Sequence, residues 1–300
     1  MDNLDYGIIG NCKSAALVSK TGSVDWCCLP QFDSPSVFGK LLDDQIGGSF
    51  SFKVDDSYQI TQQYIENTVI LVTKFSNGLD AFEVRDFMPR YYKKTDIYHA
   101  PPEFIRYIKY ISGKPTVKVN YDPKLEYAKG ETNTYVKNNF VVSLTDNETY
   151  DTLFLYTDLN KEKVLKGEVL EITSDHYFLV GYHEKLFTPT LENVFLEYER
   201  TKVYWLNWIE RTTSYSRYNA EISRSAMTLK LMSYDKTGAV LAAVTTSLPE
   251  TIGEVRNWDY RFCWIRDASM VIKVISTLGH KNMAKRYLKF IINLMPDKDE

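Results

Sequence analysis

The chain has 300 residues, of which 44% are hydrophobic and 25% charged, and its formal net charge is −3. This balance is typical of a globular protein and offers no basic surface for nucleic acid or an anionic membrane. No apolar run approaches the roughly 18 residues of a membrane span. At this length we expect about two domains.

The cysteines and histidines argue against a metal site. Cys12, Cys27, Cys28 and Cys263 lack the spacing of zinc ligands, and the four histidines are scattered. The sequence therefore predicts no metal and no cofactor. Residues 1–5 also lack the basic and apolar stretches of a secretory signal, so we expect free thiols in a reducing cytoplasm.

The first part of the chain predicts a hairpin. Two short apolar runs, 15–19 and 24–29, flank a turn that contains Gly22. Residues 32–38 follow as a polar loop that contains Pro35, and we expect no regular structure there.

From residue 50 to about 185 the sequence predicts strands. In the stretch 116–121, Val117, Val119 and Tyr121 alternate with Lys118 and Asn120, as in a half-buried strand. Ten such segments, separated by turn residues, predict a large antiparallel sandwich. The predicted strands are Ser49–Val54, Thr68–Phe75, Ala81–Phe87, Phe104–Ser112, Thr116–Tyr121, Thr134–Val136, Phe140–Leu144, Thr152–Tyr156, Val169–Thr173 and Tyr177–Tyr182.

Near residue 190 the apolar period becomes helical. Thr190 or Asn193 could cap a helix that ends near Arg211, and a second helix should run from about 220 to 234. Residues 239–267 are expected to be loop-like. Two more amphipathic helices follow, one after Asp267 and one from about Asn282. Because so few helices cannot bury all their apolar stripes, we expect further chain after Glu300.

The densest cluster of charges and aromatics is the stretch 256–267. Trp258, Tyr260, Phe262 and Trp264 fall on alternate positions, which predicts an extended segment that leads into a helix. Such a segment can hold a polar ligand. It can equally be structural, with Asp259 paired to Arg261 or to Arg256 at the start of the helix.

Several blocks resemble glycoside hydrolase family 15, which contains glucoamylases, glucodextranases and prokaryotic-type trehalases. They are the motif 257–268, the segments 237–250, 22–26 and 32–38, and the Arg-Asp-Phe-Met-Pro run at 85–89. The resemblance implies a β+α fold, with a large antiparallel β-super-sandwich followed by linker helices and the first helices of an incomplete (α/α)6 barrel. The implied domains are 1–188, a trehalase-like sandwich, 189–236, a helical linker, and 237–300, the start of the catalytic domain.

The same resemblance implies cleavage of terminal α-glucosidic bonds with inversion, by a general acid and a general base that are both Glu. Neither can be placed in residues 1–300, so we expect this stretch alone to be inactive. What carries over is the first sugar subsite, at Arg266 and Asp267. A carboxylate and a guanidinium together can bind the hydroxyls of one sugar edge, and Trp264 and Trp258 can supply apolar faces.

Two other interpretations stay open. The sandwich could act as a stand-alone carbohydrate-binding or structural module, or the chain could be part of an inverting disaccharide phosphorylase. The expected partner is an α-glucoside or α-glucan, with no nucleic acid and no membrane, and a homo-oligomer is left open. The sequence does not choose among trehalose, maltose, starch and isomaltose-type substrates.

Overall fold

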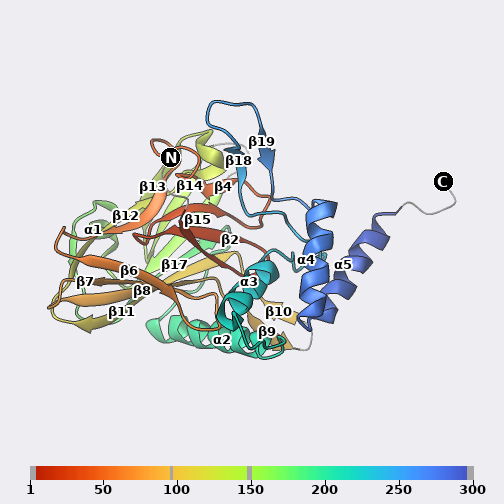
Figure 1. Ribbon diagram of the computed structural model, residues 1–300. Helices are drawn as coiled ribbons and strands as arrows, with labels where there is room; N and C mark the ends of the chain where they lie inside the picture. The colour runs from red at the N-terminus through yellow and green to blue at the C-terminus, as the bar shows by residue number, and fades with distance from the viewer. Residues whose placement is uncertain (1–4, 95–96, 147–150, 296–300) are drawn as a thin grey trace. The chain divides into compact units, whose positions relative to one another are not determined.

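The computed structural model describes residues 5–94, 97–146 and 151–295. The chain forms two compact units, Met1–Tyr204 and Trp205–Glu300. The predicted order, strands first and helices afterwards, is confirmed (Figure 1). The predicted domain boundaries after residues 188 and 236 stay predictions, because a division into compact units does not test them.

The first unit is built on two antiparallel sheets, here called sheet A and sheet B. Within the described residues, sheet A has seven strands: β1 (Tyr6–Gly10), β2 (Ala15–Ser19), β3 (Val24–Cys28), β4 (Ser36–Phe38), β5 (Ser49–Lys53), β12 (Thr116–Asp122) and β16 (Val169–Glu171). Sheet B, counted the same way, has eight: β6 (Gln59–Tyr64), β7 (Leu71–Ser76), β8 (Ala81–Phe87), β11 (Glu103–Ser112), β13 (Thr132–Lys137), β14 (Phe140–Thr145), β15 (Thr152–Thr157) and β17 (His176–Tyr182).

Buried side chains from both sheets make one core, so the unit is a sandwich. Phe50 of β5 meets Phe178 of β17 edge to face, with ring centroids 5.4 Å apart. The alternation in β12 is as predicted, since Val117, Val119 and Tyr121 are buried. Shorter elements complete the unit: a hairpin of β9 (Tyr91–Lys94) and β10 (Ile97–His99), the helix α1 (Lys161–Leu165) and the 3-10 turn η1 (Leu125–Ala128).

Two predictions for this unit need correction. The segment 32–38 is not all loop, because Ser36–Phe38 forms β4 and is fully buried beside β3. The strand Gln59–Tyr64 was missed, because its polar sequence QITQQY shows no apolar alternation; as an edge strand, it buries little. The hairpin of β2 and β3 is confirmed, and Gly22 in its turn has φ +78°, a conformation that favours glycine.

The helix α2 (Leu191–Ile209) begins with reciprocal capping, as the sequence predicts. The backbone N–H of Asn193 donates to Thr190 Oγ1 at 3.2 Å, and the N–H of Thr190 donates to Asn193 Oδ1 at 3.2 Å. Val194 and Tyr198 of α2 pack on the outer face of sheet B. The first turns of α2 therefore form a third layer on the sandwich.

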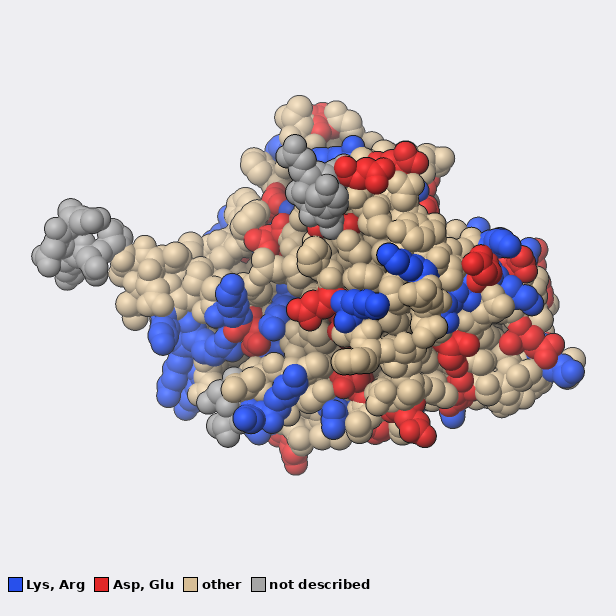
Figure 2. Space-filling view, turned by 180° about the vertical axis from the view of Figure 1, so that it is seen from behind, with Lys and Arg blue, Asp and Glu red and all other residues tan. Residues whose placement is uncertain are grey.

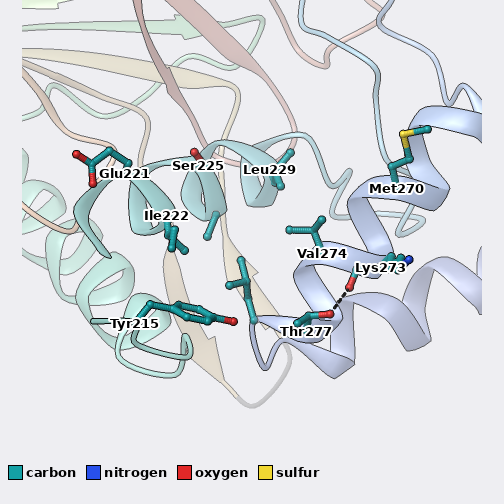
Figure 3. Close-up of a pocket in the computed structure, with 11 residues that line it drawn as sticks. Tyr215, Glu221, Ile222, Ser225, Leu229, Met270, Lys273, Val274 and Thr277 are labelled. Carbon is teal, nitrogen blue, oxygen red and sulfur yellow. Dashed lines mark hydrogen bonds between the residues drawn. The ribbon is translucent and has the colours of Figure 1, made fainter. Parts of the chain in front are cut away.

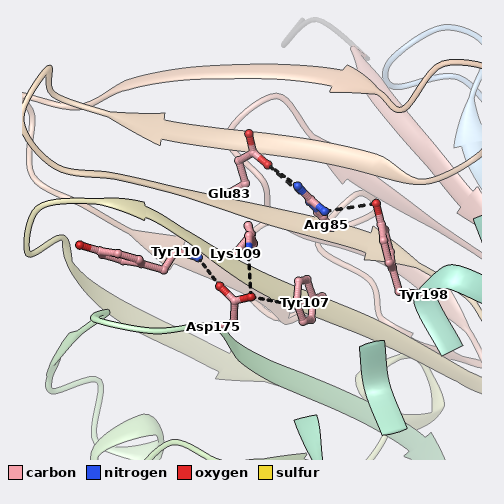
Figure 4. A network of polar contacts seen from close by, with 7 residues as sticks. All are labelled: Glu83, Arg85, Tyr107, Lys109, Tyr110, Asp175 and Tyr198. Atoms are coloured by element: carbon pink, nitrogen blue, oxygen red, sulfur yellow. Dashed lines mark hydrogen bonds and ion pairs between the residues drawn. The ribbon is translucent and has the colours of Figure 1, made fainter. Parts of the chain in front are cut away.

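Polar contacts reinforce this layer (Figure 4). The Tyr198 hydroxyl accepts a hydrogen bond from Arg85 of β8 at 3.2 Å, and its ring stacks on that of Tyr107 with centroids 6.0 Å apart. The Tyr107 hydroxyl donates to Asp175 at 2.5 Å, and Lys109 donates to the same carboxylate at 2.9 Å. Burial alone would raise the pKa of Asp175, but these hydrogen bonds outweigh it and hold the pKa below its usual value.

The guanidinium of a fully buried ion pair in sheet B links the two sheets. Arg106 of β11 pairs with Asp86 of β8, with Nε and Oδ1 2.8 Å apart, and both side chains are fully buried. The same guanidinium crosses to sheet A, where it donates to the carbonyls of Phe50 and Gly22. Its charge also lies over the ring of Phe52, 4.5 Å from the centroid.

A second cluster of ionisable groups joins α2 to the hairpin of β9 and β10. The Tyr91 hydroxyl donates to Glu197 of α2 at 2.8 Å, and His99 Nε2 lies 3.6 Å from the same carboxylate. Burial, together with the negative charges of Glu197 and Glu184, raises the pKa of Glu103 to about 7. Burial also lowers the pKa of His99 to about 4.

The second unit is mainly helical. Its described elements are α3 (Asn219–Leu231), β18 (Thr246–Pro249), β19 (Asn257–Asp259), α4 (Ile265–Thr277) and α5 (Lys281–Asn293). Its core contains Ala226 of α3, Ile275 and Leu278 from α4 and its end, and Met283 of α5. The helices start within a few residues of their predicted positions.

The surface carries both signs of charge. Over most of the face drawn in Figure 2, acidic and basic side chains lie interspersed. None of the described helices is both long and apolar enough to cross a membrane.

Removing one partner of the inter-sheet pair should destabilise the sandwich strongly. Arg106→Met leaves the carboxylate of Asp86 buried without its counter-charge, so we expect a loss of about 3–5 kcal/mol in the free energy of unfolding. The double variant Asp86→Asn with Arg106→Met should lose less than Arg106→Met alone. Urea denaturation measures both. Lys20→Ala, at an exposed ion pair, is the control and should change stability by less than about 1 kcal/mol.

The raised pKa of Glu103 gives a second prediction. Its stabilising contribution is complete below about pH 4.5 and is lost as pH rises through about 7, because the folded state then must ionise a buried acid. Glu103→Gln should therefore gain stability relative to the unchanged protein between pH 5 and 7, by at most about 1.4 kcal/mol per pH unit. Urea denaturation at several pH values tests this. A difference in stability that does not change with pH would contradict it.

Candidate functional site

The segment 256–264 is extended over only part of its length. Strand β19 covers Asn257–Asp259 and pairs with β18, and residues 260–262 then form a turn. The prediction of an extended segment is therefore wrong for residues 260–262, whereas Trp264 again has extended backbone angles. The physical reason is local: Asp259 Oδ1 accepts the backbone N–H of Arg261 at 3.0 Å, which closes the turn.

The structure chooses between the two predicted partners of Asp259. Arg261 Nε lies 3.0 Å from Oδ1 and NH2 lies 2.7 Å from Oδ2, so the pair is bidentate. Arg261 is buried, with 6% of its side chain exposed. Arg256 instead pairs with Glu250, at 3.3 Å and on the surface.

Three of the four aromatic rings of the motif, those of Trp258, Tyr260 and Trp264, meet at the start of α4. Trp264 is the residue before the helix, and its ring lies 6.4 Å from that of Trp258, edge to face, and 5.8 Å from that of Tyr260. The Trp264 indole N–H donates to the backbone carbonyl of Asp259 at 3.3 Å. The indole N–H of Trp258 donates to Glu250 at 2.9 Å, and 44% of Trp258 is exposed.

Arg266 and Asp267 occupy the first turn of α4. Their side chains are 72% and 42% exposed, and Arg266 NH2 lies 3.3 Å from Asp267 Oδ2. An acidic residue in the first turn is stabilised by the positive end of the helix dipole. In the structure, therefore, Trp258 contacts Trp264 and Arg266 pairs with Asp267. The two pairs adjoin each other along the chain, because Trp264 is the residue before α4 and Arg266 and Asp267 are in its first turn. A fork of five donors beside an open carboxylate can bind vicinal hydroxyls.

Arg261 keeps the carboxylate of Asp259 in its charged form. Burial alone would raise the pKa of Asp259, but the hydrogen bonds and charge of Arg261 outweigh it and the pKa lies below its usual value. Asp259 is therefore a fixed anion that is already hydrogen-bonded, and it is poorly suited to exchange a proton. In the described part of the chain, no group of three or more His, Cys, Asp or Glu side chains could hold a metal ion.

A groove between α3 and α4 was not predicted from the sequence (Figure 3). Its volume is about 630 Å³, and its lining is mostly apolar, with Ile222 and Leu229 on α3 and Met270 and Val274 on α4. None of the four predicted site residues lines it. Met270 and Val274, four residues apart on α4, form an exposed apolar stripe beside the buried Ile275, and this stripe is the signal that could have indicated the groove.

Comparison with known proteins decides the family. Residues 5–151 match the family described as trehalase-like, N-terminal, and residues 216–296 match glycosyl hydrolases family 15. The chain belongs to glycoside hydrolase family 15. The second match contains β18, β19, α4 and α5, and with them every predicted site residue of this family 15 chain.

Relatives align along nearly the whole chain. A trehalase of Thermoplasma volcanium is 33% identical over 297 residues, which are 97% of this chain and 47% of the relative. A trehalase of Thermoplasma acidophilum is 35% identical over 279 residues, 91% of this chain and 47% of the relative. A trehalase of Mycolicibacterium smegmatis is 30% identical over an alignment of 312 residues, which covers 97% of this chain and 47% of the relative. This family 15 chain therefore spans about half the length of the relatives it matches.

The first turn of α4 should tolerate substitution without loss of folding. Arg266→Ala and Asp267→Asn change exposed side chains, whose pairing and helix-dipole contributions are each worth less than about 1 kcal/mol. Thermal unfolding followed by circular dichroism should therefore show a melting temperature within a few degrees of the unchanged chain. A loss of more than about 3 kcal/mol in either variant would mean that these residues are structural.

Proposed function

We propose that this chain is the N-terminal half of an enzyme that hydrolyses terminal α-glucosidic bonds, with trehalose as the first substrate to test. The observation that carries the proposal is the exposed Arg266–Asp267 pair on the first turn of α4, beside Trp264, inside the region that matches family 15. Trehalose is favoured because the relatives described above are named trehalases.

In the proposed site, Asp267 accepts hydrogen bonds from sugar hydroxyls and Arg266 donates to neighbouring oxygens. Trp264 and Trp258 offer apolar ring faces to the C–H groups of the sugar. Such contacts hold the terminal glucose so that its anomeric carbon faces the catalytic groups, and correct placement alone can supply much of the rate.

The catalytic acid and base are proposed to lie outside residues 1–300. Inversion needs two carboxyl groups roughly 6.5–9.5 Å apart, so that a water molecule fits beside the anomeric carbon. Of the carboxylates near the motif, Asp259 is bound by Arg261 and Glu250 by Arg256 and Trp258. Asp267 is assigned to the sugar subsite, and Glu254 does not match a catalytic position of the family. We therefore expect residues 1–300 alone to be inactive.

Surface apolar side chains support a proposed helical barrel around α4 and α5. Exposed hydrophobic side chains on α4 include Met270 and Val274, and those on α5 include Leu288 and Ile292. Helices with apolar side chains on two faces are usually covered on both. In this proposal, further helices of an (α/α)6 barrel cover these faces and the groove between α3 and α4.

The four cysteines, none of which forms a disulfide, support placement in the cytoplasm.

Substrate tests on the full-length protein decide the reaction. Trehalose, maltose, isomaltose and starch should be compared with and without inorganic phosphate. Glucose release that needs no phosphate supports a hydrolase, and formation of a glucose phosphate supports the inverting phosphorylase instead. Inversion on trehalose should release one of the two glucose molecules first as the β-anomer, which NMR detects before mutarotation. Release of only the α-anomer would contradict inversion.

Changing the subsite should affect turnover and leave folding intact. Asp267→Asn and Arg266→Ala should each lower kcat/KM by about 100-fold or more, because they remove contacts that stabilise the transition state. Lys273→Ala, on the same helix but two turns further along, is the matched control and should stay within about twofold. Near-normal activity of folded Asp267→Asn would contradict the proposed subsite.

A carbohydrate-binding role for the sandwich alone is tested separately. Titration of residues 1–185 with trehalose and with soluble starch should give no binding stronger than millimolar, since the proposed sugar contacts lie on α4. Affinity in the millimolar range or better would favour the binding-module interpretation.

A further inference from the structure

Arg261 is one of the few buried charged side chains of the second unit. It lies under the turn that joins β19 to α4, and it makes two side-chain hydrogen bonds to Asp259, at 3.0 and 2.7 Å. Its own backbone N–H donates to the same carboxylate at 3.0 Å. Two guanidinium contacts and one backbone contact to the same carboxylate fix the position of the turn.

The fixed turn is connected to the segment before β18 and to the helix α4. The Tyr260 carbonyl accepts the N–H of Ala243 at 2.8 Å, and the Phe262 carbonyl accepts the N–H of Ala242 at 3.2 Å. On the other side, the Asp259 carbonyl accepts the indole N–H of Trp264 at 3.3 Å. Trp264 directly precedes α4, so the orientation of its ring and the start of the helix both depend on Asp259.

We propose that Arg261 is a positioning residue of the sugar site: by clamping Asp259, it orients Trp264 and the first turn of α4, which carries Arg266 and Asp267. This inference rests on the proposed function. Arg261 itself is buried and contacts no sugar in this proposal, and it acts through Asp259 and Trp264.

The chain contains a natural comparison for this clamp. Arg256 belongs to the same hairpin and also pairs with a carboxylate, that of Glu250, at 3.3 Å. That pair is exposed, with 62% and 40% of the two side chains accessible, and Glu250 is linked to Trp258 and not to Trp264. Weakening it should leave the start of α4 unchanged, since exposed pairs contribute little.

The test replaces each arginine by lysine in the full-length protein. Lysine keeps the positive charge but cannot bind both oxygens of a carboxylate with a planar fork. Arg261→Lys should lower kcat/KM for the best α-glucoside by about 10-fold or more, mainly through kcat, because small displacements of aligned groups reduce turnover strongly. Arg256→Lys should stay within about twofold. Both are measured well below their melting temperatures, so that unfolding does not contribute.

A double-mutant cycle separates positioning from general destabilisation. Trp264→Phe removes the indole N–H that binds the Asp259 carbonyl. If Arg261 acts through this contact, Arg261→Lys should cost at least about fivefold less in kcat/KM when Trp264→Phe is already present. Effects that simply multiply would overturn the proposal, as would normal activity of Arg261→Lys.

The two proposals fail in different ways. If the unchanged protein hydrolyses no α-glucoside, the proposed function is wrong. The effect of Arg261 on the position of Trp264 is then tested by NMR of the protein with labelled tryptophan. The indole N–H signal of Trp264 should shift in Arg261→Lys and not in Arg256→Lys. Equal signals in all three proteins would overturn the clamp. If the unchanged protein is active and Arg261→Lys is equally active, only the clamp is wrong.

Discussion

The sandwich depends on a charge placed where no water can reach it. Arg106 sits between the two sheets with its side chain fully buried, and it is neutralised by Asp86 from its own sheet. Because a guanidinium has five donors, it can satisfy that carboxylate and still bind the carbonyls of Phe50 and Gly22 on sheet A. The guanidinium therefore adds directional contacts between the two layers, as does the hydrogen bond from Gln62 of β6 to the Ser19 carbonyl of β2 at 2.8 Å.

The second unit uses the same chemistry on a smaller scale. Arg261 is buried under a turn, and its bidentate pairing with Asp259 closes that turn and anchors Trp264. Arg266, five residues later, has a side chain that is 72% exposed. The motif thus divides its arginines among different tasks. Arg261 is buried and holds the backbone, Arg266 lies in solvent where a ligand can meet it, and Arg256 pairs with Glu250 on the surface. An isolated guanidinium is costly to bury, and the buried Arg261 binds both oxygens of its carboxylate partner, at 3.0 and 2.7 Å, whereas the exposed Arg256 and Arg266 each lie 3.3 Å from a carboxylate.

Helix α2 connects the two kinds of architecture along the chain. Its first turns pack on sheet B through Val194 and Tyr198, and its last turn belongs to the second unit, where Trp208 stacks on His280 with ring centroids 3.9 Å apart. Its acidic side chain Glu197 faces the hairpin of β9 and β10. The helix is thus held by aromatic stacking at one end and by a cluster of ionisable groups near the other.

The sequence by itself determined the class of the fold, most of the strands and the family. The alternation in β12 and the Thr190–Asn193 cap could be predicted because each depends only on backbone geometry and on residues close in sequence. Only the tertiary structure decided which carboxylate each arginine of the motif binds, since Asp259 and Glu250 are both within reach in the sequence. It also showed the strand Gln59–Tyr64, whose polar residues are tolerated at a sheet edge, and the groove between α3 and α4, which exists only when two helices meet. Long-range pairing of this kind depends on which surfaces exclude water, and no short stretch of sequence contains that information.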